Sequence, residues 1–156
     1  MLPACDSGYR SAVALRWYDK AFHELTVDEL YAILALRDQV FVVEQACIYQ
    51  EADGHDPAAR HLWAADGDQI HAYLRILPPG EKFAELAMGR ILVAPVARGT
   101  GLGKQLVRRA LASVGAVPVR IGAQAHLERF YGELGFVRTG EPFDEDGIPH
   151  IEMLRA

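Results

Sequence analysis

A glycine-rich segment with flanking basic residues carries the clearest chemical signal in the sequence. It reads Arg-Gly-Thr-Gly-Leu-Gly-Lys over residues 98–104 and follows an apolar run. Glycines at alternate positions remove side chains that would keep a ligand away from the backbone. A helix that opens here directs its free amides and the positive end of its dipole at one point. The segment therefore predicts a pyrophosphate site built from Arg98, Gly99, Thr100, Gly101, Leu102, Gly103 and Lys104.

Two familiar phosphate motifs do not fit this segment. A Walker A loop needs a glycine where Arg98 stands and a serine or threonine where Gln105 stands. The dinucleotide fingerprint G-x-G-x-x-G fails because the third glycine, Gly103, comes one residue early. The remaining alternative is a flexible loop at a glycine-rich helix start.

Periodicity and turn residues place the elements that must position this segment. Thr26 followed by Glu29 is a capping-box pattern and predicts a helix over Val27–Val42, before an irregular loop over Gln45–Pro57. Asp66-Gly67-Asp68 is typical of a hairpin turn. We expect strands at Val13–Tyr18, His61–Ala65, Gln69–Leu77, Leu86–Val93, Pro118–Gly122, Phe136–Phe143 and Ile148–Leu154, and helices at Gly101–Val114 and His126–Leu134.

This order of elements predicts an α/β fold with a central, mostly antiparallel mixed sheet flanked by helices. The unit from Leu86 to Gly122 should form its one parallel crossover, which is expected to be right-handed. The length of 156 residues fits a single domain, which we place at residues 13–156 after a flexible tail at residues 1–12.

The glycine segment and a second motif together resemble the GNAT acyltransferase superfamily. Arg98-x-x-Gly101-x-Gly103 resembles its acetyl-CoA loop, and Gln124–Phe136 resembles its tyrosine-bearing helix followed by Gly-Phe. Five further stretches in order are similar to the ElaA-like branch of this family: residues 37–45, 53–56, 60–62, 122–127 and 145–151. The resemblance implies the GNAT fold and an acetyl-CoA-dependent N-acetyltransferase acting on a primary amine of a small molecule or protein.

The resemblance also implies roles for particular residues. Backbone amides of Ile91, Leu92 and Val93 would hold the pantetheine arm of CoA, and one of them would polarise the thioester carbonyl. Gln124 stands where many members carry an asparagine that contacts this arm. Tyr131 matches the general acid, since a phenol suits protonation of a leaving thiolate. The alternative for Tyr131 is an aromatic packing residue.

The general base is open among three residues. Glu44, at the end of the first predicted helix, is the leading candidate, either as a base or as an ammonium-binding group; the alternative is a solvated glutamate. His61 and His150 follow, because a neutral imidazole suits a base near pH 7. Each histidine has the alternative of a hydrogen-bonded packing residue. We expect the acceptor pocket to be lined by Phe41–Gln45, the Gln45–Pro57 loop and the turn at Asp146–His150.

Composition excludes several other classes. The formal net charge of −5 argues against a general nucleic-acid binder, and no apolar run reaches the roughly 18 residues of a membrane span. Cys5 and Cys47 are expected to be free thiols in a cytoplasmic protein. Asp53, His55 and Asp56 lack the pattern of a metal site and indicate a turn-rich loop. Symmetry favours a homodimer if the chain assembles.

Two further functions remain open at this point. A non-catalytic acyl-CoA sensor or interaction module would keep the phosphate site without turnover. Another nucleotide-phosphate binder is disfavoured by the two failed motifs.

Overall fold

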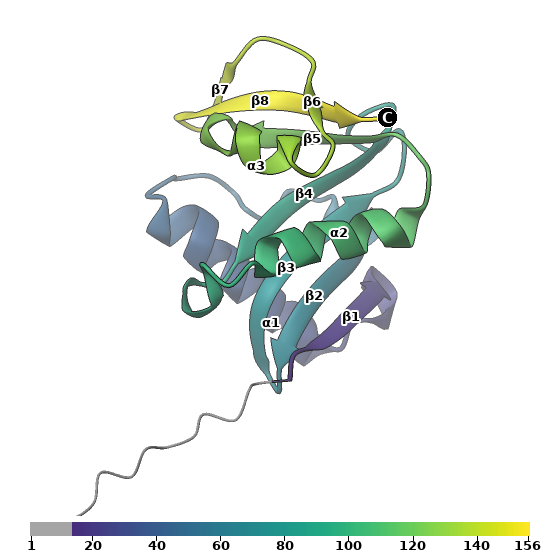
Figure 1. Ribbon diagram of the computed structural model, residues 1–156. Coiled ribbons are helices and arrows are strands. Elements are labelled where there is room, and N and C mark those ends of the chain that lie inside the picture. The colour runs from purple at the N-terminus through teal and green to yellow at the C-terminus, as the bar shows by residue number, and fades with distance from the viewer. Residues whose placement is uncertain (1–13) are drawn as a thin grey trace, which may run out of the picture.

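One mixed β-sheet organises residues 14–156, the part of the chain that the computed structural model describes (Figure 1). Its strand order is β1-β2-β3-β4-β5-β8-β6, with β7 paired to β8, and β4–β5 is the one parallel pair in residues 14–156, so the predicted mixed sheet is confirmed. The strands are β1 (Arg16–Ala21), β2 (Arg60–Asp66), β3 (Gln69–Leu77), β4 (Leu86–Val93), β5 (Val119–Gln124), β6 (Val137–Arg138), β7 (Phe143–Glu145) and β8 (Ile148–Arg155). The predicted tail at residues 1–12, including Cys5, lies outside the described residues.

Helices cover both faces of the sheet (Figure 1). Leu62 and Leu74 pack with Leu106 on the face of α2 (Leu102–Val114), whereas Trp63 and Tyr73 pack with Ile33 on the face of α1 (Val27–Arg37). Successive strand residues point to opposite faces, so β2 and β3 need apolar side chains on both faces, as the run Leu62–Ala65 shows. The third helix, α3 (Glu128–Gly132), follows a 3-10 turn, η5 (Ala125–Leu127), and is shorter than the predicted His126–Leu134.

The first helix begins as predicted but changes character. The Thr26 hydroxyl accepts a hydrogen bond from the Glu29 amide, and the Glu29 carboxylate accepts one from the Thr26 amide, so the capping box is confirmed. The α-helix ends at Arg37, however, and wider π-helical turns continue over η2 (Asp38–Glu44). Over a segment as short as Asp38–Glu44, the spacing of apolar residues does not distinguish an α-helix from a π-helix.

The C-terminal pairing was predicted with one error. Phe136–Phe143 is not a single strand but two short ones, β6 and β7, which pair with different parts of β8. Pro142 has no amide hydrogen to donate to a strand ladder, which interrupts the run.

The parallel pair β4–β5 is short. It holds only where Leu86 lies opposite Val119 and Ala87 lies opposite Arg120. Beyond Ala87 the two strands separate, as Figure 1 shows, so the backbone of β4 has no ladder partner in β5 over its second half. This separation leaves an opening in the middle of the sheet.

Six charged side chains bind together beside this opening. We call them the buried ionic network: Arg37, Glu51, Asp53, Asp56, Arg75 and Arg90. Arg37 is fully buried; its Nε donates to Glu51 Oε1 over 2.8 Å and its Nη1 to Asp56 Oδ1 over 2.7 Å. The charges balance, three positive and three negative, as burial requires. The acidic Gln45–Pro57 loop therefore supplies counterions that tie α1 to β3 and β4.

The network should make the fold sensitive to acid. Burial alone would raise the pKa values of Asp53 and Asp56, but hydrogen bonds and attraction from Arg75 and Arg37 hold both below their usual range. As the pH falls, the unfolded chain then takes up protons first. The stabilisation is therefore complete at neutral pH and should decline from about pH 4 downward. Urea unfolding at pH 7 and pH 3 measures this decline.

Asp53→Asn isolates the contribution of one network carboxylate. At pH 7 it should lower the free energy of unfolding by about 2 kcal/mol, and it should lose less stability than the wild type on acidification. Asp66→Asn, at an exposed site on the β2–β3 turn, is the control. Equal acid sensitivity of all three proteins would contradict this assignment.

Candidate functional site

A cleft of about 700 Å³ lies where β4 and β5 separate. Its walls come from the end of η2 and the loop after it, from β4 and β5, from the start of α2, from α3 and from the β7–β8 turn. The three segments predicted to line an acceptor pocket contribute here, among them Phe41, Tyr49 and Asp146. The three segments thus line one cleft, and its role as an acceptor pocket stays a prediction.

The glycine segment forms the turn that starts α2. Gly99 and Gly101 have positive φ angles of 76° and 81°, and Gly101 is the N-cap residue of the helix. No side chain caps this end, and the first amides of any α-helix have no partner inside it. Thr100 turns inward instead, where its hydroxyl donates to the Ala97 carbonyl oxygen over 2.6 Å. The amides of Leu102, Gly103 and Lys104 are thus suited to bind an anion.

Gly103 serves a different purpose from the one its position in the motif indicates. A Cβ atom there would lie 3.3 Å from Val93 Cγ2 and 3.6 Å from Phe130 Cζ. Its missing side chain lets α2 approach β4 and α3 closely. At Gly101, by contrast, nothing lies within 4 Å of such an atom, so the space above the helix start is open.

Both cations of the glycine segment have carboxylate partners. Arg98 binds Glu44 through two hydrogen bonds, Nη1 to Oε1 over 2.6 Å and Nη2 to Oε2 over 3.1 Å. Lys104 pairs with Glu133 of the turn after α3. The structure therefore brings together two residues, Arg98 and Glu44, for which the sequence indicated separate roles. The hydrogen bonds from Arg98 lower the pKa of Glu44, so it is a carboxylate at neutral pH.

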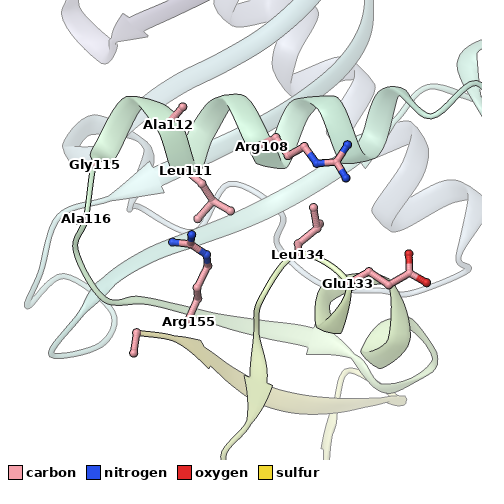
Figure 2. A pocket seen from close by; sticks show the side chains of 9 residues that line it. Arg108, Leu111, Ala112, Gly115, Ala116, Glu133, Leu134 and Arg155 are labelled. Atoms are coloured by element: carbon pink, nitrogen blue, oxygen red, sulfur yellow. The ribbon is translucent and has the colours of Figure 1, made fainter.

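A second groove of about 590 Å³ runs between α2 and the end of β8. Figure 2 shows Arg108 and Arg155 on its two sides, with Leu111 and Leu134 between them. Glu133, the partner of Lys104, also lines it, and the α2 residues in its wall belong to the second half of that helix. Arg155 gave no signal in the sequence, because it comes from a strand far from the glycine motif.

Tyr131 lies on α3 with its side chain in the cleft wall. It is 5% exposed and packs edge-on against Phe130 and Phe136, with ring centroids 5.0 and 5.9 Å away. Its hydroxyl makes no hydrogen bond to residues 14–156 of the chain. Burial raises its pKa well above the usual value of a phenol. The group therefore holds its proton at neutral pH and is free to donate it.

The two candidate histidines are placed very differently. His61 is fully buried in β2 and is absent from the cleft wall. Its Nε2 donates to the Asp56 carbonyl oxygen over 3.1 Å, so its Nδ1 accepts from the Tyr73 hydroxyl over 2.7 Å. Burial lowers its pKa. These contacts correspond to the packing alternative for His61.

His150, on β8, does line the cleft. Its Nδ1 donates to the Ile148 carbonyl oxygen over 2.7 Å, and its Nε2 lies 3.4 Å from the Glu145 carboxylate. The ring stacks on Phe143. A proton on Nδ1 leaves the lone pair of a neutral imidazole on Nε2.

The remaining predicted residues also meet in the cleft. Ile91, Leu92 and Val93 line it from β4, and Gln124 lines it from the end of β5. The Gln124 amide donates to the Gln45 side chain over 3.1 Å, which joins β5 to the loop after η2.

Arg75 and Arg90 are among the lining residues that sequence reasoning missed. The available signal was an arginine inside an otherwise apolar strand, because a charge in such a run requires a buried partner. Within residues 14–156, no group of three or more His, Cys, Asp or Glu side chains is arranged to hold a metal ion. No helix in this range is long and apolar enough to cross a membrane.

Comparisons with known proteins agree with this geometry. Residues 23–155 match the family described as Acetyltransferase (GNAT) domain. Protein ElaA of Escherichia coli K12 is 42% identical over 147 residues, which cover 90% of this chain and 96% of ElaA. A crystal structure of an acyl-CoA N-acyltransferase from Pseudomonas aeruginosa is 47% identical, with a TM-score of 0.88 over 92% of this chain and 100% of that one.

A more distant structure shares the fold alone. The CoA-dependent acyl-homoserine lactone synthase BjaI, solved with SAM and isopentyl-CoA, is 18% identical, with a TM-score of 0.74 over 90% of this chain and 82% of BjaI. The GNAT fold supports acyl-CoA-dependent acyl transfer. With the family match over most of its length and its ElaA relatives, this chain belongs to the GNAT acyltransferase superfamily, in its ElaA-like branch.

Proposed function

We propose that the chain transfers the acetyl group of acetyl-CoA directly to a primary amine of a small molecule or protein, in the cytoplasm. One observation carries the proposal: the uncapped start of α2, through Arg98 and Gly103, and Tyr131, whose hydroxyl has no partner among residues 14–156, line the same cleft. One group suits a pyrophosphate and the other suits a leaving thiolate. CoA carries both at the two ends of its pantetheine arm.

The chain offers a separate surface to each part of CoA. The backbone of residues 98–104 would bind the pyrophosphate. The edge of β4 at Ile91–Val93 that has no ladder partner in β5 would hold the pantetheine arm, with Gln124 close to it. The groove in Figure 2 lies along the second half of α2 and carries Arg108, whose charge suits the phosphorylated adenosine end.

In the reaction, the neutral amine nitrogen adds to the thioester carbonyl carbon. A C–N bond forms, the C–S bond breaks, and the departing thiolate takes the proton of the Tyr131 hydroxyl. The nitrogen loses one proton as the amide forms. This proton passes through the base to solvent, and solvent returns one proton to the Tyr131 phenolate, so the enzyme ends the cycle in its starting protonation state. Backbone amides facing the carbonyl oxygen stabilise the negative charge that develops on it.

Glu44 and His150 remain as groups for the amine side of the cleft. Glu44 is ionised, which suits binding of an ammonium group more than removal of its proton. His150 presents Nε2 as an acceptor. We leave His61 out of the proposal because it is buried away from the cleft.

A non-catalytic acyl-CoA sensor is the second candidate. It is favoured by the engagement of Glu44 with Arg98, because a carboxylate that already holds two arginine hydrogen bonds attracts an amine less strongly. A thiol-release assay with acetyl-CoA and a panel of amines decides between the two. Tight binding of acetyl-CoA without transfer to any amine favours the sensor.

Gly101→Val should weaken acetyl-CoA binding by tenfold or more, since a branched side chain at φ 81° distorts the helix start. Calorimetry measures the change. Gly67→Val places the same residue at a positive φ in the distant β2–β3 turn and should lower stability without changing affinity. Equal affinities of the two variants would contradict the placement of the pyrophosphate.

Tyr131→Phe should lower kcat by roughly 10²-fold or more while the Kd for acetyl-CoA changes little. The fold should tolerate the change because the hydroxyl has no partner among residues 14–156. Steady-state kinetics and calorimetry give the two numbers, with Tyr31→Phe at an exposed site as control. Parallel losses in kcat and in binding would indicate a packing role instead.

Glu44→Gln tests the contact with Arg98. Freeing Arg98 for the pyrophosphate should tighten acetyl-CoA binding about two- to fivefold, the range of an exposed ion pair, yet slow the transfer to the amine. Glu133→Gln frees Lys104 in the same way and should tighten binding without slowing transfer. Unchanged transfer in Glu44→Gln would remove Glu44 from the amine side.

A further inference from the structure

Arg90 has a backbone conformation that is rare inside a strand. Its φ angle is +53°, in the left-handed region that non-glycine residues seldom occupy. Strand β3 pairs Arg75 with Gly89 and Tyr73 with Leu92, so β4 places two residues, Arg90 and Ile91, against one residue of β3. This irregularity is a β-bulge, a feature often found beside active sites.

The side chain of Arg90 is held in place by the buried ionic network. Its Nε donates to Glu51 Oε1 over 2.5 Å, and its Nη2 donates to the Glu51 carbonyl oxygen over 3.1 Å and to Asp53 Oδ2 over 3.2 Å. The guanidinium also lies over the Tyr49 ring, 5.7 Å from its centroid. Glu51 is 4% exposed and is bound in turn by Arg37, so the anchor is rigid.

The bulge lies in the part of β4 whose backbone groups face the cleft. It falls beyond Ala87, in the part of β4 that has no ladder partner in β5, and just before Leu92 and Val93 in the cleft wall. One extra residue reverses which backbone groups face the neighbouring strand and which face away from it. The conformation at Arg90 therefore decides which amides of β4 are presented to the cleft.

We propose that Arg90 is a positioning residue for acyl transfer: its anchored side chain maintains the left-handed conformation that turns a bulge amide toward the thioester carbonyl. The proposal rests on the proposed function. Arg90 does not touch the reacting atoms in this scheme. It acts through the backbone, where a fixed donor needs no reorganisation as charge develops on the carbonyl oxygen.

Calorimetry with two probes tests the proposal. One is CoA, and the other is the acetyl-CoA analogue in which a methylene replaces the thioester sulfur, an unreactive ketone that keeps the carbonyl oxygen in its place. The wild type should bind the ketone roughly tenfold more tightly than CoA, the gain expected from one well-placed hydrogen bond. Arg90→Ala should lose most of this difference while its affinity for CoA stays within about twofold, because a remote backbone change leaves the pyrophosphate site intact.

Two further substitutions separate the backbone from the side chain. Arg90→Gly keeps access to positive φ and should retain more of the ketone preference than Arg90→Ala. Arg90→Lys has a charge but no fork to hold Glu51 and Asp53 together, so it should resemble Arg90→Ala. If Arg90→Ala does not fold, the comparison of glycine with lysine carries the test. Arg60→Ala, which breaks an Arg–Asp pair between β1 and β2, should leave both affinities unchanged.

Three results would overturn the proposal. Equal losses for CoA and the ketone would indicate general disruption of the cleft. An unaltered ketone preference in Arg90→Ala, with only the KM for the amine raised, would make Arg90 an acceptor-binding residue. Failure of the wild type to bind CoA at all would instead overturn the proposed function, and this inference with it.

Discussion

The short contact between β4 and β5 is the constraint on which the rest of the molecule depends. Two residue pairs hold these strands in parallel, and the chain then lets them separate. A continuous ladder would bury the backbone of β4 and close the cleft. The opening must instead be maintained by other contacts, because β4 and β5 form no ladder with each other across it. Core packing of α2 on one face and α1 on the other supplies part of that support.

The buried ionic network supplies much of the remainder. Buried ion pairs seldom stabilise a fold more than apolar packing of the same volume does, so stability alone is a weak reason for six charged groups here. The fixed geometry of these ion pairs is a better reason for their presence. Each arginine fixes a carboxylate at a defined distance, and the Gln45–Pro57 loop, which has no regular ladder of its own, is thereby held against β3 and β4. The ion pairs therefore hold this wall of the cleft in a fixed position.

Much of the fold and of the cleft was predictable from the sequence, and the features that were not predicted have physical explanations. The bounds of β4, the capping box at Thr26 and the helix after Gly101 follow from local signals that tertiary structure reinforces. The roles of Glu44 and Arg98 follow from local signals too, but their pairing joins residues 54 positions apart, which no local pattern encodes. The role of His61 stayed open for the same reason: a strand histidine looks alike in sequence whether it faces a cleft or, as here, the Tyr73 hydroxyl. The catalytic roles themselves stay predictions.

The β7–β8 turn contrasts with the opposite wall of the cleft. Asp146 and Gly147 occupy left-handed conformations in an exposed hairpin, and the turn takes no part in the ion pairs that hold the Gln45–Pro57 loop. Substitutions at the other exposed positions of this hairpin should therefore cost little folding stability, whereas loss of one network residue in the opposite wall leaves a buried charge without its partner. Proteins descended from such a chain would change their acceptor specificity through the β7–β8 turn, while the Gln45–Pro57 wall of the cleft kept its residues.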